Sequence, residues 1–429
     1  MSKRPTIMLL TTPQTYRTEA FLTAAAQLGA EVVQVLDMPK PLADPGGMQL
    51  GIDFSHLETA VSQILTYAEE RPLTAIIAVD DAGVALAAQV SQTLGLPHNS
   101  VQASEAARDK FLMRQLLAKA VVASPPFMQF QLSEAITSVI QRVNDEIGFP
   151  CVIKPLHLNG SRGVIRVNNA EELRAATGRV GQMLKRIDPN SSMLVESYIP
   201  GIEVALEGIL DNGRLQTLAL FDKPDPLEGP YFEETLYITP SRLPQETQDR
   251  ITQTAEAGAK ALGLQTGSVH AELRVNDDGA WIVEVNGRSI GGLCSQSLRF
   301  DILLEEENNS EPRQLSLEEL ILRQACGFDV RSLKREQSAS GVMMIPIPHA
   351  GILRAVYGQS EAQQVPFIDE INITTPLNNR LVPLPEGESY LGFIFASGKT
   401  PEAVESALRH AHSLLRFDID EEIPLLVKG

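Results

Sequence analysis

The sequence predicts an α/β protein of several domains, because strand-like and helical patterns alternate near its start and strands dominate its middle. Its 429 residues exceed the length at which a single hydrophobic core stops growing, about 250 to 300 residues. Apolar, β-branched runs separated by helical spacing are typical of an open parallel sheet. We therefore expect an N-terminal open parallel α/β domain, an α+β middle part and a final α/β unit.

The first hundred residues carry the pattern of the parallel sheet. The strand-like runs are "TIMLL" at 6–10, "EVVQVL" at 31–36 and "TAIIAV" at 74–79. Apolar residues recur at helical spacing between these runs, and the first helical pattern stops at Gly29, as a helix ending in a left-handed residue would. No GxGxxG follows the first run, so the dinucleotide-binding fingerprint is missing.

Beyond this domain, strands alternate with a few long helices. Helices are predicted over residues 104–120, 243–262 and 316–327. Ser104 is the expected N-cap of the first, and Ser316 with Glu319 gives the third a capping box. A last α/β unit begins near residue 340. In it, "GFIFASGKT" resembles a phosphate loop with one residue too many, and we interpret it as strand, N-cap Thr400 and helix.

Charge and cysteine content exclude several classes of protein. The net charge of −18, from 36 basic and 54 acidic residues, opposes binding to nucleic acid or anionic lipid, so a small substrate is expected. The three cysteines have no disulfide or zinc spacing and are expected to be free thiols. No apolar run reaches the ~18 residues of a membrane span or the length of a signal-peptide core. We expect a cytoplasmic protein.

The stretch "HAELRVNDDGAWIVEVNGR" predicts a hairpin with polar groups on one face. "NDDG" is a turn signal, so Glu272 and Glu284 face each other across neighbouring strands, and Asn286 lies two residues further along. Carboxylate and amide oxygens with open positions suit Mg²⁺. A solvated face with Glu and Arg pairs is the alternative, but it does not explain why the polar face continues into "RSIGG".

Two further stretches have both a functional and a structural interpretation. In "CVIKPLHLNGSRG", Lys154 ends an apolar strand and precedes a glycine-containing loop, a layout that cradles phosphate. By itself, that stretch is better explained by an ordinary hairpin with a flexible loop. In "LVESYIPGIEV", Glu196 and Glu203 flank a Pro-Gly turn, where a hinge would present backbone groups to an adenine edge. Strand, turn and strand is the structural alternative.

Taken together and in this order, these stretches resemble the ATP-grasp superfamily over the whole chain. The long stretches at 221–244, 340–358 and 380–398 look like the branch of L-amino-acid ligases and carnosine synthase. The resemblance implies an ATP-grasp fold with a C-terminal lid-like α/β subdomain. Its expected domains are 1–100, the N-terminal domain; 101–200, the small subdomain with the glycine loop; 201–330, the core with the metal and phosphate site; and 331–429, the C-terminal subdomain.

The resemblance also implies a role for each matching residue. Arg288 and Lys154 would be catalytic, Lys110 and Lys154 would contact the ATP phosphates, and Glu203 would hold the ribose. The adenine would be held by Glu196, Tyr198 and Ile199, the phosphate loop formed by Gly160, Ser161 and Gly163, the metal bound by Glu272, Glu284 and Asn286, and the substrate contacted by Arg288, Ser289, Gly291 and Gly292. Lys223, Asp225 and Glu233 lie in a stretch typical of the family but receive no role, and a solvated charged loop is the equal alternative for them. His270 fits a neighbouring pocket position, with a core histidine as the alternative.

The activity implied by the resemblance is ATP-dependent amide formation. A small carboxylic or amino acid would be phosphorylated to an acylphosphate, and an amine would then displace phosphate. ATP and Mg²⁺ are the implied cofactors, with Mn²⁺ as the alternative ion, and a homodimer is expected by analogy. Three alternatives stay open: a carboxylase that makes carboxyphosphate from bicarbonate, a purine-pathway amine ligase, and a nucleotide-binding regulatory protein without catalysis.

Overall fold

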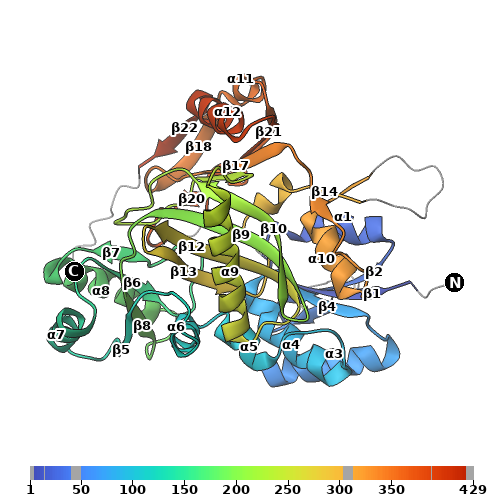
Figure 1. Cartoon of the computed structure of the whole chain (residues 1–429), viewed down its shortest axis with the longest axis horizontal. Coiled ribbons are helices and arrows are strands. Elements are labelled where there is room, and N and C mark those ends of the chain that lie inside the picture. The colour runs from blue at the N-terminus through green and yellow to red at the C-terminus, as the bar shows by residue number, and fades with distance from the viewer. Residues whose placement is uncertain (1–3, 14, 40–49, 303–312, 388, 422–429) are drawn as a thin grey trace.

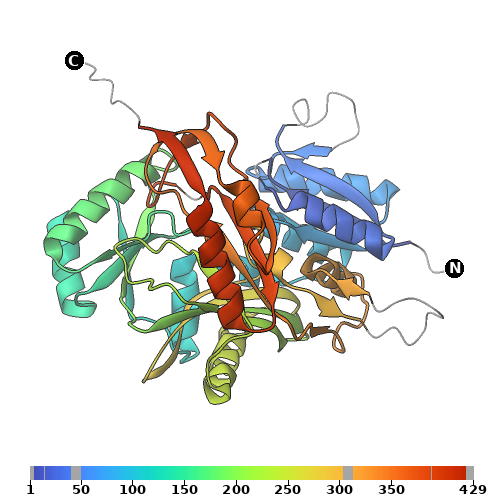
Figure 2. The same ribbon diagram turned by 90° about the horizontal axis from the view of Figure 1, so that it is seen from above.

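The protein is described here from a computed structural model that covers residues 4–13, 15–39, 50–302, 313–387 and 389–421. A large central sheet separates two smaller units (Figure 1). The N-terminal parallel sheet lies on one side, and a small antiparallel sheet with its two helices lies on the other; the same arrangement is seen from above (Figure 2). Within the covered residues, no helix has the length and apolar character needed to cross a membrane.

The N-terminal sheet is parallel, as the sequence predicts. Its order is β3-β2-β1-β4, and every pairing within it is parallel. Its strands are β1 (Thr6–Thr11), β2 (Glu31–Asp37), β3 (Leu50–Ile52) and β4 (Ala75–Ala78), and its helices are α1 (Thr18–Leu28), α3 (Leu57–Glu70) and α4 (Asp81–Leu94). The left-handed Gly29 ends α1, because its backbone N–H reaches back to the last carbonyls of the helix.

The single helix predicted over residues 104–120 is wrong, because the chain forms two helices there. These are α5 (Val101–Ala106) and α6 (Lys110–Lys119). Ser100, and not Ser104, caps α5, and Ser104 is buried within it. The Asp109 carboxylate accepts hydrogen bonds from the N–H groups of Phe111 and Leu112 and so begins a new helix. The break puts Lys110 in the first turn of α6.

The small antiparallel sheet follows, in the order β5-β8-β6-β7. Its strands are β5 (Phe127–Gln131), β6 (Cys151–Pro155), β7 (Ile165–Val167) and β8 (Ser192–Ser197), and its helices are α7 (Ile136–Glu146) and α8 (Ala170–Lys185). Valine, leucine and isoleucine side chains of the two helices and the sheet share one buried cluster. This unit carries the glycine loop between β6 and β7.

The central sheet has the order β13-β12-β9-β10-β11-β17-β21-β19. Its first part consists of β9 (Ile202–Asp211), β10 (Arg214–Lys223), β11 (Leu236–Thr239), β12 (Gly267–Asn276) and β13 (Gly279–Asn286). The helix α9 (Gln245–Leu262) packs against β9, β10, β12 and β13. Its own residues Ile251, Ala255 and Ala259 are fully buried on the side that faces the sheet. The predicted helix at 243–262 and the predicted hairpin at "NDDG" are both confirmed.

The central sheet continues into the C-terminal part of the chain, because β11 pairs with β17. That part contains β17 (Ala339–Ile345), β18 (Gly351–Tyr357), α11 (Gln359–Gln363), β19 (Ile368–Asn372), β20 (Arg380–Leu381), β21 (Gly392–Gly398), α12 (Pro401–Leu414) and β22 (Arg416–Asp420). The Thr400 hydroxyl caps α12 and Pro401 is its first residue, so "GFIFASGKT" is the strand-to-helix turn that the sequence predicts.

Short elements connect the core to the N-terminal domain. They are η1 (Cys294–Ser297), β14 (Phe300–Asp301), β15 (Gln314–Leu315), α10 (Leu317–Ala325) and β16 (Lys334–Arg335). The predicted capping box is present in part, since the Ser316 hydroxyl accepts a hydrogen bond from the Glu319 N–H. Helix α10 packs on α1, which joins the two domains through a shared apolar cluster.

Candidate nucleotide and metal site

A cavity of about 280 Å³ lies where the small sheet, the central sheet and the C-terminal part meet. Nearly all the predicted site residues line it: Lys110, Lys154, Gly160, Ser161, Glu196, Tyr198, Ile199, Glu203, Glu272, Glu284, Asn286, Arg288, Gly291 and Gly292. Tyr16 reaches it from the N-terminal domain, and Met344 and Tyr390 from the C-terminal part. The structure therefore gathers residues spread over almost the whole chain around one space.

Gly163 and Ser289 are the two predicted site residues that do not line this cavity. The Gly163 N–H donates to the carbonyl of Pro385 at 2.8 Å, and its φ of +72° suits glycine. A Cβ there would lie 2.8 Å from Cγ of Pro155, so Gly163 shapes the loop. The Ser289 hydroxyl is buried and accepts a hydrogen bond from Arg17 at 2.5 Å. Neither position supports direct substrate contact.

Glu196, near the end of β8, is held by two cations inside the small subdomain. Its carboxylate lies 2.7 Å from Nε of Arg114 and 2.5 Å from Nζ of Lys154, and all three side chains are buried. Burial opposes ionisation of this carboxyl, but the charges of Arg114 and Lys154 outweigh burial and lower its pKa. Arg114 was missed in the sequence, although it lies one helical turn after Lys110 on the same face of α6.

The glycine loop between β6 and β7 closes over the cavity from the small subdomain. Gly160 and Ser161 both line the cavity and both have positive φ, +61° and +56°. The carbonyl of Leu158 accepts a hydrogen bond from Nζ of Lys110 at 2.9 Å. The Asn159 amide donates to the carboxylate of Asp81 at 2.8 Å, so the loop touches the N-terminal domain. Lysines and backbone groups thus converge where an anion would bind.

The hairpin of β12 and β13 brings the predicted metal ligands together. Glu272 and Glu284 are directly paired across the two strands, and Asn286 is paired with His270. Nζ of Lys110 lies 3.4 Å from the Glu284 carboxylate. All three predicted ligands line the cavity, as two carboxylates and one amide. This arrangement is the one that the alternation of side chains along the sequence predicts.

Arg288 reaches the cavity from just beyond β13. Its Nε donates to Asp81 at 2.8 Å, and its Nη1 donates to the carbonyl of Ser289 at 2.9 Å. Burial lowers the pKa of Arg288, but the charge of Asp81 outweighs burial and raises it, so the guanidinium stays charged. Asp81 was missed because it lies in the first turn of α4, 207 residues away in sequence. No local pattern could have paired the two.

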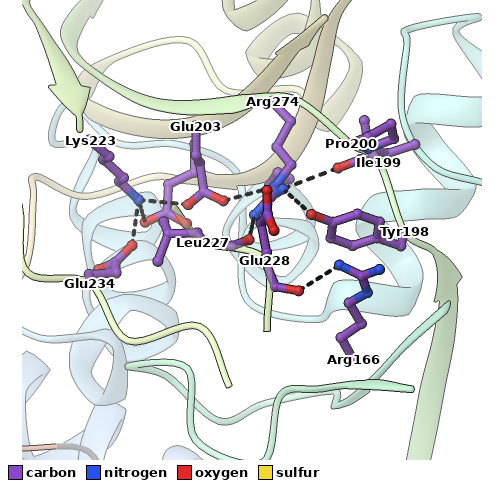
Figure 3. Close-up of polar contacts among 12 residues, drawn as sticks. Arg166, Tyr198, Ile199, Pro200, Glu203, Lys223, Leu227, Glu228, Glu234 and Arg274 are labelled. Carbon is purple, nitrogen blue, oxygen red and sulfur yellow. Dashed lines mark hydrogen bonds and ion pairs between the residues drawn. The ribbon is translucent and has the colours of Figure 1, made fainter. Parts of the chain in front are cut away.

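Lys223, to which the sequence assigned no role, is buried among three carboxylates, so the solvated loop is wrong for this residue. Its Nζ contacts Glu234 and lies 2.9 Å from Glu203 (Figure 3). The carboxylate of Glu272 lies 3.4 Å from the same nitrogen. These three carboxylate groups are close enough together to hold a metal ion. Burial raises the pKa of Glu234 to about 7. Glu234 is a further cavity residue that sequence reasoning missed.

His270 lies in the same buried layer, between two carboxylates. Its ring nitrogens lie 3.1 Å from Glu207 and 3.4 Å from Glu272. Burial lowers the pKa of His270, but hydrogen bonds to these two carboxylates outweigh burial and raise it to about 9.

Asp225 pairs with Arg409 at 2.6 Å and accepts a hydrogen bond from Thr235, and it does not line the cavity. Glu233 is half-buried, and burial raises its pKa.

Comparison with known proteins agrees with this architecture. Residues 147–297 match the ATP-grasp domain, and residues 343–420 match the L-amino acid ligase C-terminal domain 2. The solved L-amino acid ligase from Bacillus licheniformis has the same fold, with a TM-score of 0.81 and 22% identity over 98% of this chain and 100% of that one. At that identity, the likeness establishes the fold alone.

Two curated relatives are similar to this chain over about half of its length. Alanine–anticapsin ligase of Bacillus subtilis is 29% identical over 276 residues, which is 57% of both proteins. D-alanine–D-alanine ligase of Desulforudis audaxviator is 30% identical over 217 residues, 48% of this chain and 67% of that protein. The chain spans 57 to 60% of the length of the alanine–anticapsin ligases that it matches.

Proposed function

We propose that this chain, which belongs to the ATP-grasp superfamily, is an ATP-dependent carboxylate–amine ligase. Its products would be an amide, ADP and phosphate. The observation that carries the proposal is the cavity in which Glu272, Glu284 and Asn286 face the lysines and Arg288. The named activities of the relatives, alanine–anticapsin ligation and D-alanine–D-alanine ligation, support the same reaction class for this chain.

The chemistry of the cavity fits a nucleotide with magnesium. Glu272, Glu284 and Asn286 offer hard oxygen ligands on one wall, which is the donor set that Mg²⁺ or Mn²⁺ takes together with phosphate oxygens. Lys110 and Lys154 come from the facing subdomain and supply positive charge for those phosphates. A bound magnesium ion would offset the negative charge that accumulates on the phosphates during transfer.

The residues of the chain would act mainly by positioning and by electrostatics. A carboxylate oxygen of the acid substrate attacks the γ-phosphorus of ATP, an O–P bond forms, and ADP leaves. Arg288 lines the cavity as a charged group, which the Asp81 carboxylate holds in place at 2.8 Å, and would stabilise the transferred phosphoryl group. An amine then attacks the acyl carbon, the amine nitrogen loses a proton, and phosphate departs with the C–O bond electrons.

Exclusion of water is the other requirement, because an acylphosphate hydrolyses readily. The loop with Gly160 and Ser161 covers the cavity from the small subdomain, and Asn159 ties it to Asp81. The lysines and the loop come from the small subdomain and the metal-ligand wall from the central sheet, so the reactants would be enclosed only when these parts are together. A cytoplasmic location and a homodimer remain predictions from the sequence.

The experiment that tests the function combines phosphate release with mass spectrometry. Purified protein with Mg-ATP is offered pools of amino acids and small carboxylic acids, with and without added amines. We expect phosphate release in at least one pool, together with a product whose mass equals acid plus amine minus water. Phosphate release with bicarbonate alone would favour a carboxylase, and ATP binding without turnover in any pool would favour a regulatory protein.

A further inference from the structure

Arg274, on β12, is a buried cation that the proposed reaction does not use directly. Only 4% of its surface is exposed. Its Nε donates to Glu203 at 3.1 Å, and its Nη1 donates to the Tyr198 hydroxyl at 3.0 Å and to the carbonyl of Ile199 at 3.2 Å (Figure 3). Its Nη2 donates to the carbonyl of Leu227. One guanidinium therefore joins the hinge, the start of β9 and the segment after β10.

The hinge is held by a second arginine as well. The ring of Tyr198 contacts two guanidinium groups, with Cζ of Arg274 5.1 Å and Cζ of Arg166 4.1 Å from its centroid. Arg166 also donates to the carbonyl of Glu228 at 2.7 Å. Cations within about 6 Å of an aromatic ring are attracted to it. The backbone of Tyr198 and Ile199, which is predicted to meet the adenine, is thereby fixed relative to β12.

Glu203 is fixed in the same way, through both carboxylate oxygens. Oε1 pairs with Lys223 at 2.9 Å and Oε2 pairs with Arg274 at 3.1 Å. Each oxygen of a carboxylate can accept two hydrogen bonds, so each keeps one acceptor site. Glu203 lines the cavity, so these sites are available to a ligand there.

We infer that Arg274 is a positioning residue for the nucleotide, which fixes the Glu203 carboxylate for the ribose hydroxyls and the Ile199 backbone for the adenine in one arrangement. The inference rests on the proposed function, because it takes the cavity to bind ATP. The sequence implied nucleotide roles for its partners Glu203, Tyr198 and Ile199, but none for Arg274. The planar fork of an arginine is required, since a lysine carries one point charge and cannot reach Glu203 and two backbone carbonyls together.

The test compares binding of ATP with that of 2′,3′-dideoxy-ATP, which lacks both sugar hydroxyls. Calorimetry gives the dissociation constant of each nucleotide, with magnesium, for the wild type and for Arg274→Lys. We expect the wild type to prefer ATP by about tenfold or more, as a hydrogen bond to a charged group allows. In Arg274→Lys the preference should shrink to about threefold or less. An unchanged preference in a folded variant would overturn the inference.

Two further variants separate positioning from general damage. In a Glu203→Gln background, Arg274→Lys should leave the remaining preference for ATP over the dideoxy nucleotide unchanged, because both changes act on the same contact. Additive losses would overturn the inference.

Arg335→Lys is the matched control, because Arg335 is partly buried, donates to the carbonyl of Ser338 and does not line the cavity. It should keep the wild-type preference. Failure of the wild type to bind ATP at all would contradict the proposed function itself.

Discussion

The two hinge carboxylates, Glu196 and Glu203, lie 2.5 to 3.1 Å from the cations that pair with them. The carboxylates of the β12–β13 hairpin, Glu272 and Glu284, lie 3.4 Å from their nearest cations, Lys223 or His270 and Lys110. Glu203 and Glu272 are neighbours, because both contact Lys223. The two pairs of carboxylates therefore differ in how closely the protein's own cations approach them.

The difference indicates which part of the site the protein builds before a ligand arrives. Close ion pairs fix the hinge, so the nucleotide would meet a surface already in place. The looser wall of β12 and β13 would reach full neutralisation only with a divalent ion, which carboxylate and amide oxygens suit. Substitutions in the two pairs of carboxylates should therefore have different consequences: lost turnover at the β12–β13 hairpin and lost stability at the hinge.

The largest effect is expected for Glu284→Gln. The amide keeps the shape of the side chain but loses the charge that would hold the metal, so turnover should fall by about a thousandfold, since a metal contributes several kcal/mol to the transition state. The thermal unfolding midpoint should change little, because Glu284 meets its cation only at 3.4 Å. Phosphate release under saturating Mg-ATP measures the loss, and near-normal turnover would remove Glu284 from the metal site.

At the hinge, Glu196→Gln should act on stability. The change leaves Arg114 and Lys154 buried without their shared anion, so unfolding free energy should fall by about 3 kcal/mol at neutral pH. Denaturation in urea measures it. A loss of turnover without any loss of stability would contradict the difference between the hinge carboxylates and the hairpin carboxylates.

The pH dependence of that loss has a definite sign. The pKa of Glu196 in the folded protein lies below its usual value of 4.5. The ionised Glu196 carboxylate therefore stabilises the folded protein above pH 4.5. This stabilisation is lost as the pH falls through the lowered pKa. The gap in stability between the wild type and Glu196→Gln should close in acid, and a gap that stays constant from pH 7 to the acid limit would argue against the ion pairs as its source.

Arg288→Met tests the part of the cavity in which phosphoryl transfer is proposed. The guanidinium is proposed to act on the transferred phosphoryl group, so the chemical step should slow by about a hundredfold while ATP affinity changes little. Single-turnover kinetics and nucleotide binding separate the two quantities. A fall in ATP affinity with an unchanged chemical step would assign Arg288 to ground-state binding.

Asp81→Asn should have the smallest effect, about tenfold on turnover. Asp81 would act through Arg288 and through Asn159 of the glycine loop, each at 2.8 Å, without touching the reactants. We expect more phosphate released per amide formed, because a loosened loop admits water to the acylphosphate. The ratio of phosphate to amide is the measurement, and a lower rate with an unchanged ratio would leave Asp81 a structural residue.

Local patterns predicted the parts of the site that lie on single elements. The pairing of Glu272 with Glu284 followed from a turn signal and the two-residue period of strands, and Lys154 from the end of an apolar strand. The same reasoning failed at residues 104–120, because the Asp109 carboxylate restarts the helix and outweighs the continuous apolar spacing there.

Such local patterns could not predict contacts between segments that are distant in sequence. Asp81 meets Arg288 only because α4 and the end of β13 lie together in the fold, and Arg274 meets Tyr198 across two domains. Ser289 follows Arg288 in sequence, yet its hydroxyl is taken by Arg17 from the N-terminal domain. Nothing in the spacing of residues along the chain reveals which of two neighbours faces the cavity.

The central claim is that the acid is activated by phosphorylation, and oxygen tracing tests it most directly. Once a substrate pair is known, the acid is supplied with ¹⁸O in its carboxylate and the released phosphate is analysed by mass spectrometry. An acylphosphate transfers one labelled oxygen to each phosphate, because the carboxylate oxygen stays with phosphorus when the amine displaces it. Amide formation with unlabelled phosphate would contradict the mechanism proposed for this chain.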